Sequence, residues 1–162
     1  MKQLKQQLIS ALGILVVRIG KILPANFSPL GSFGFFSGNP LLFFLSILIF
    51  DYFFGGFYLG QSWVYLAFSI YPLLGYLSRG KIKRQVFLIP LASLLFFVIS
   101  NFGVWLNWYP RTTEGLVHCY LLALPFYGRT LMGDLSFGYG YLLLRQLVKK
   151  YQHHFLVPDK IN

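Results

Sequence analysis

Apolar runs separated by short polar breaks dominate this chain. Several runs approach the roughly 20 residues that a helix needs to cross a bilayer. The pattern predicts an all-α, polytopic membrane bundle of about six transmembrane helices, with one short re-entrant or interfacial helix. The six expected segments cover residues 4–23, 30–38, 41–57, 62–77, 85–105 and 129 or 130 to 149, and the short helix covers residues 113–124.

Two of these segments are short for a crossing. Glycines at three- and four-residue intervals mark residues 30–38 and allow close helix approach in a membrane. At about 15–18 Å this segment must be shielded by its neighbours, and Asn39-Pro40 then breaks it. Residues 113–124 suit an interfacial helix better than a full crossing. A competing assignment merges residues 27–57 into one crossing and places the amino terminus outside.

Basic residues flank the apolar runs in clusters. Six crossings with both termini inside bring all of these clusters to the cytoplasmic face of a bacterial inner membrane. Residues 1–150 then form a single transmembrane domain and residues 151–162 a short basic cytoplasmic tail. The clusters are Lys2 with Lys5, the loop with Arg79, Lys81, Lys83 and Arg84, and the terminal Arg145, Lys149 and Lys150.

The amino-terminal stretch also resembles a signal peptide, because lysines precede an apolar segment. Arg18 and Lys21 stand where a small-residue cleavage site belongs, so we expect a retained first helix. The net charge of +10 could indicate nucleic acid. The basic residues instead cluster beside the apolar runs, which is typical of residues that set membrane topology. No nucleic-acid partner is expected.

No enzyme motif is evident in the sequence. Cys119 is the single cysteine, which excludes an internal disulfide and a multi-cysteine metal site. His118 has no second histidine three or four residues away. Glycine-rich phosphate-binding and nucleophile-elbow patterns are absent. We therefore expect no catalytic residue, cofactor or metal, and any active transport needs energy from a partner.

Polar and aromatic side chains concentrate between residues 100 and 134. Trp105 and Trp108 suit packing against a ligand ring, while Asn101, Asn107, Glu114 and His118 supply hydrogen bonds. On the six-crossing arrangement three ionisable residues share a similar depth near the outer face, and they are expected to form an internal charge network. These are Arg18, Asp51 and Asp134. Alternatively, Trp108 and Tyr109 belong to an interfacial belt, Arg111 and Arg129 contact headgroups, and Asp51 or Asp134 merely neutralises Arg18.

The segments PANFSPLGSFGFFSG and SNFGVWLNWYPRTTEGLVHCYLLALPFYGRTLMGD, with a proline-started helix carrying an aspartate between them, resemble a known group. It is a family of small, uncharacterised bacterial membrane proteins to which a transport role is ascribed. That family is similar to the S components of energy-coupling factor transporters. Asn39-Pro40 sits where S components often have a Gly-Pro break, and Asp51 where many carry an acid.

The resemblance implies a six-helix bundle whose site opens outward and is formed by the first connecting loop and the ends of later helices. Asn26 in that loop and Arg129 complete the candidate ligand-binding set. A coupling subunit and two ATPases would drive uptake of a small solute such as a vitamin. S components commonly dock on that subunit through small residues four apart on the first helix, whereas here Leu15 follows Ala11 at that spacing.

Two other functions compete with solute capture. The first is a structural or assembly subunit of a larger membrane complex, without a ligand, whose glycine-spaced helices pack on a partner. The second is an intramembrane enzyme that uses Glu114 or His118 on a lipid. Loss of binding to the partner on substitution of Gly31, Gly34 or Gly38 would favour the first. Loss of turnover in Glu114→Gln or His118→Ala would favour the second.

Overall fold

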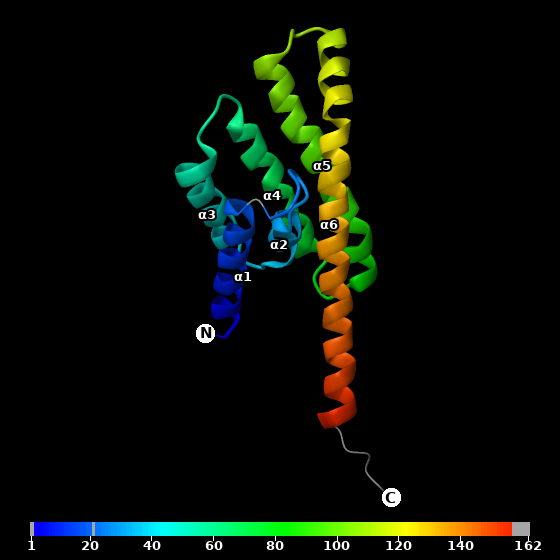
Figure 1. Ribbon diagram of the computed structural model, residues 1–162. Helices are drawn as coiled ribbons and strands as arrows, with labels where there is room; N and C mark the ends of the chain where they lie inside the picture. The colour runs from blue at the N-terminus through cyan, green and yellow to red at the C-terminus, as the bar shows by residue number, and fades with distance from the viewer. Residues whose placement is uncertain (1, 21, 157–162) are drawn as a thin grey trace, which may run out of the picture.

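The computed structural model describes residues 2–20 and 22–156, and over these residues it contains helices and no strand. This confirms the predicted all-α class for that part of the chain. Figure 1 shows that the start of α1 and the end of α6 lie at the same end of the bundle. The elements are α1 (Lys2–Ile19), α2 (Leu30–Phe36), α3 (Pro40–Phe50), the π-helical turn η1 (Asp51–Gly55), α4 (Gln61–Leu77), α5 (Ile82–Trp108) and α6 (Thr113–Leu156).

Contacts at the two ends show that successive helices alternate in direction. At one end, Gln7 of α1 donates to the carbonyl of Ser37 after α2, and Arg79 after α4 donates to the carbonyl of Gly38 at 3.3 Å. At the other end, Trp108 at the end of α5 donates to the carbonyl of Leu59, which precedes α4, at 3.2 Å. The bundle therefore has one end with Gln7 and Arg79 and an opposite end with the loops before α4 and α6.

A cap and a proline separate α2 from α3, as the sequence predicts. The side chain of Asn39 accepts a hydrogen bond from the amide of Leu42 at 3.2 Å, and Pro40 occupies the first helical position. Residues 27–57, which the competing assignment merges into one crossing, are divided between α2, α3 and η1. At seven residues, α2 is only about 10 Å long.

The separate short helix expected at residues 113–124 is also wrong, because α6 continues from Thr113 to Leu156 through Pro125. A proline removes one amide donor but need not end a helix that neighbouring residues support. With 44 residues α6 is about 66 Å long, and its last part extends beyond the other helices (Figure 1). Of the expected tail, residues 151–156 belong to α6, and residues 157–162 lie outside the described residues.

Among the described residues, α5 alone is both long and apolar enough to cross a bilayer, with 27 residues and a mean hydropathy of 2.1 in its most apolar stretch. Within the protein, 28% of that stretch is buried, and Phe87, Leu94 and Val98 are among its exposed apolar residues. The apolar parts Gln7–Ile19 and Pro40–Gly55 are shorter. Length and composition thus indicate membrane association through α5.

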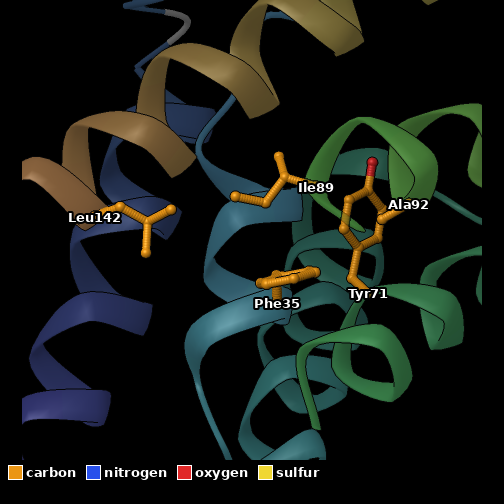
Figure 2. Packing of buried hydrophobic residues seen from close by; sticks show 5 residues of the cluster. All are labelled: Phe35, Tyr71, Ile89, Ala92 and Leu142. Carbon is orange, nitrogen blue, oxygen red and sulfur yellow. The ribbon is translucent and has the colours of Figure 1, made fainter. Parts of the chain in front are cut away.

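The short helix α2 lies at the centre of the packing. Phe35 of α2 packs with Tyr71 of α4, Ile89 and Ala92 of α5 and Leu142 of α6 (Figure 2). A second core joins α1, α2 and α3 through Ile14, Leu30, Phe43 and Ile47. Because α2 contributes to both cores, its position determines how the two halves of the bundle meet.

Candidate functional site

An ionic centre lies where α1 ends and α3 passes into η1. Arg18 Nη2 is 4.0 Å from Asp51 Oδ1, and the two side chains are 19% and 12% exposed. The guanidinium carbon also lies 3.7 Å from the centre of the Phe50 ring, within cation–π range. The structure thus brings together two of the three residues expected in the internal charge network.

Two side chains of α4 complete this Arg18–Asp51 centre. Asp51 Oδ2 accepts hydrogen bonds from Gln61 Nε2 at 2.8 Å and from the Tyr65 hydroxyl at 2.9 Å. Gln61 Oε1 in turn accepts from the amide of Tyr58 at 3.1 Å. Sequence reasoning missed Gln61 and Tyr65, although their spacing of four residues at the start of an apolar helix places both on one face.

The local backbone around Asp51 departs from an α-helix. Residues 51–55 form a single π-helical turn, a feature that is frequent at functional sites. A Cβ at Gly55 would lie 2.8 Å from Asp51 Oδ1, so glycine is needed for the carboxylate to lie against the turn. Gly56 and Gly60 then adopt positive φ angles of 73° and 87°. The ionic centre therefore adjoins a segment built for an unusual backbone path.

The guanidinium of Arg18 retains an unused donor. Its Nη1 atom is buried and has no hydrogen-bond partner among the described residues. Even the contact to Asp51 is longer than the roughly 2.7–2.9 Å of a charge-assisted hydrogen bond. A buried donor without an acceptor costs about 1–3 kcal/mol, and more when the group is charged. An acceptor delivered to this nitrogen would therefore be bound favourably.

Asp134, the third member of the expected network, lies in a different centre. Its Oδ2 atom accepts hydrogen bonds from the Tyr71 hydroxyl and from Ser93 Oγ, both at 2.5 Å, and the residue is 2% exposed. We expected Asp134 near the outer start of the last helix. Because α6 begins at Thr113, Asp134 instead lies about 32 Å along it, in the middle of the bundle.

The four candidates on α5 use their donors within the protein. Asn101 and Asn107 donate to carbonyls one turn back in α5, those of Phe97 at 2.8 Å and Gly103 at 2.7 Å. The indole of Trp105 donates to the Pro110 carbonyl at 3.0 Å, and that of Trp108 bridges to Leu59. The two indole contacts join the carboxyl end of α5 to the loops beside it, and the two asparagine contacts stay within the helix.

Glu114 and His118 line a shallow, open hollow on the outer face of α6, with Thr113, Val117 and Leu121. The backbone amide of Glu114 and the hydroxyl of Thr112 lower the pKa of the Glu114 carboxyl below its usual value. Arg129 and Asn26 are exposed elsewhere, Asn26 with a positive φ of 66°. The structure therefore does not gather the expected ligand-binding set around one enclosed pocket.

Among the described residues, the buried ionisable side chains that could bind a ligand thus lie in the Arg18–Asp51 centre and in the Asp134 centre.

Comparison with known proteins identifies a family but no characterised relative. No curated protein and no solved structure matches the chain. Residues 1–155 match the sequence profile of DUF6580, a family of unknown function, and the chain belongs to that family.

Proposed function

We propose that this protein is a multi-pass membrane protein that captures a small solute at the Arg18–Asp51 centre. It acts as a substrate-binding subunit of the S-component type, and a separate coupling subunit with ATPases drives uptake. The observation that carries the proposal is the buried Arg18 Nη1 donor, which has no acceptor among the described residues although Arg18 lies beside the Asp51 carboxylate.

The geometry of a guanidinium indicates which solutes fit. Arginine presents a planar fork of N–H groups that matches a carboxylate, and the neighbouring Phe50 ring covers one face of that fork. Gln61 and Tyr65 add polar groups on the α4 side of Asp51. A small solute with a carboxylate suits this centre.

Outward-facing apolar side chains support insertion into a bilayer. Large hydrophobic residues are exposed on every long helix, which in water would be an unusually large apolar surface. Examples that are more than half exposed are Ile9, Leu12 and Val16 on α1, Leu66 and Leu73 on α4, Phe87 on α5, and Leu121, Leu122 and Met132 on α6. We propose that lipid covers these surfaces.

Alternating helix directions support six passes through the membrane with both termini cytoplasmic. The end that holds Gln7 and Arg79 also carries the basic loop before α5, so the positive-inside tendency places it in the cytoplasm. The Arg18–Asp51 centre then lies toward the outside. In this arrangement α2 does not need to cross alone, because helices on all sides shield it.

The solute-binding proposal is tested by native mass spectrometry of the protein purified gently from its own host membrane. We expect wild type to retain a carboxylate-containing molecule. Arg18→Gln should lower its occupancy about 10- to 100-fold, the equivalent of one lost charged hydrogen bond. Arg129→Gln, which changes an exposed arginine on α6, should retain it. A wild-type protein without solute, or equal retention by Arg18→Gln, would contradict the proposal.

The same preparation tests the coupling module, since ATPase and coupling subunits should accompany the wild-type protein. Topology is tested with single cysteines in a Cys119→Ala background. A membrane-impermeant maleimide should label Leu59→Cys in intact cells and Lys81→Cys only after permeabilisation, because the two positions flank opposite ends of α4. The reverse labelling pattern would overturn the proposed orientation.

The competing assembly function needs the glycine-spaced segment to be free for a partner. In the structure, a Cβ at Gly31 would overlap Asp134 and Tyr71, and a Cβ at Gly34 would lie 2.7 Å from the Phe43 ring. Both glycines are therefore used inside this chain. That observation favours solute capture over docking through the α2 glycines.

A further inference from the structure

We propose that Asp134 is a proton-binding site, protonated while α2 is packed against α4, α5 and α6. This proposal does not rest on solute capture at the Arg18–Asp51 centre. In chemical terms, one proton adds to the Asp134 carboxylate to give the neutral carboxylic acid, and no other bond changes. The ligand of this second site is the proton itself.

The first argument is the uncharged surroundings of the carboxyl group. Asp134 is 2% exposed, and its hydrogen-bond donors are the neutral hydroxyls of Tyr71 and Ser93. No basic side chain of the described residues lies within ion-pair distance of it, whereas Asp51 has Arg18. A buried carboxylate without a cationic partner is strongly disfavoured, and taking up a proton removes the charge.

The second argument is that both hydroxyls meet the same oxygen. Tyr71 and Ser93 each lie 2.5 Å from Asp134 Oδ2, which is at the short limit for O–H···O contacts. Hydroxyl groups donate and accept, so a protonated Oδ2 can accept from one hydroxyl and donate to the other. The arrangement therefore accommodates the carboxylic acid without an unpaired hydrogen.

The ionisable groups around Asp134 are few. Between Leu30 and Phe36, α2 has none, and α5 has none after Arg84. The nearest on α4 is Tyr71, which donates to Asp134. On α6 itself, Tyr127 is close enough to interact electrostatically with Tyr71, while Arg129 is exposed. None of these groups supplies a buried positive charge, so none of them would offset the charge of an Asp134 carboxylate.

The close packing of α2 over Asp134 links this proton to the position of α2. A Cβ at Gly31 would overlap the Asp134 carboxyl, and Ser32 Oγ donates to the Asp134 backbone carbonyl at 3.1 Å. The side chain of Asp134 is thus covered directly by the α2 backbone. Loss of the proton would place a charge under this cover and favour separation of α2, which admits water.

Infrared spectroscopy of the protein in lipid nanodiscs tests the site directly. The chain has only four acidic side chains, so few carboxyl bands compete. At neutral pH we expect a protonated carboxylic-acid carbonyl band in wild type. Asp134→Asn should lose this band, and the control Asp51→Asn should keep it. Absence of the band in wild type, its loss only in Asp51→Asn, or its displacement by added sodium ions would overturn the proposal.

Two further variants keep the test decisive if Asp134→Asn fails to fold. Ser93→Ala and Tyr71→Phe each remove one hydroxyl from Oδ2, so each should shift the carbonyl band. An unshifted carbonyl band in both variants would overturn the assignment.

Hydrogen–deuterium exchange, corrected for the intrinsic pH dependence of amide exchange, provides the second readout. Residues 30–36 should become less protected at raised pH in wild type, and equal protection at neutral and raised pH would refute the link between the proton and α2.

Discussion

Alanine at position 75 would test how tightly α2 is held against α4. Gly75 is buried in α4, and a Cβ there would overlap the backbone carbonyl of Phe35 in α2. Since C···O contacts normally lie at roughly 3.3–3.6 Å, the two helices would have to separate by about one ångström or more. A backbone oxygen cannot rotate away as a side chain can. The Phe35 ring, only 4% exposed, would be displaced from its core.

The expected loss of stability follows from this obstruction. Overpacking of a core typically costs about 1–3 kcal/mol, and the rigid obstacle at Gly75 favours the upper end. Replacing glycine by alanine inside a helix also stabilises the helix by about 0.8–1.0 kcal/mol, because alanine has the higher helix propensity. Gly128→Ala in α6 receives the same gain, but its Cβ meets no atom within 4 Å. We therefore expect Gly75→Ala to be about 3 kcal/mol less stable than Gly128→Ala.

The assay is equilibrium unfolding of both variants by titration with dodecyl sulfate in mixed micelles, followed by far-ultraviolet circular dichroism. The measured quantity is the difference in unfolding free energy between Gly75→Ala and Gly128→Ala. Equal stability of the two variants would refute the close packing of α2 on α4. It would also remove the basis for placing α2 over Asp134.

Further substitutions test single contacts by the same unfolding assay. Asn39→Ala removes the side-chain cap that accepts from Leu42 and should cost about 0.5–2 kcal/mol. Tyr65→Phe removes a hydrogen bond to the Asp51 carboxylate and should cost about 1.5–3 kcal/mol, whereas Tyr52→Phe, at a residue 71% exposed, should change little. Stability unchanged in Asn39→Ala, or equal effects of the two tyrosine substitutions, would contradict these contacts.

Local chemistry allowed much of the helix assignment to be predicted. Asn39 and Pro40 predict a helix start, and α3 begins there, because capping and the fixed φ of proline act within a few residues. The apolar run at residues 62–77 agrees with α4 within one residue. Such features need no information about distant parts of the chain.

The continuity of α6 could not be predicted from apolar runs. Arg129 and Asp134 lower the local hydropathy, which describes preference for lipid and not the ability to form a helix. Backbone hydrogen bonds continue past both residues, so one helix forms where a short helix and a separate crossing were expected. This error also misplaced Asp134, because depth was counted from the wrong starting residue.

By itself, the sequence determined the all-helical class and identified Arg18, Asp51 and Asp134 as ionisable groups in apolar surroundings. Only the tertiary structure decided which of them meet. Asp51 gains Arg18 and the neutral donors of α4 because the ends of α1, η1 and α4 converge. Asp134 meets hydroxyls instead, because α6 carries it past that end into the middle of the bundle. The partners of a buried charge depend on the direction and register of the helices. Direction and register are determined jointly by residues that are far apart in the sequence.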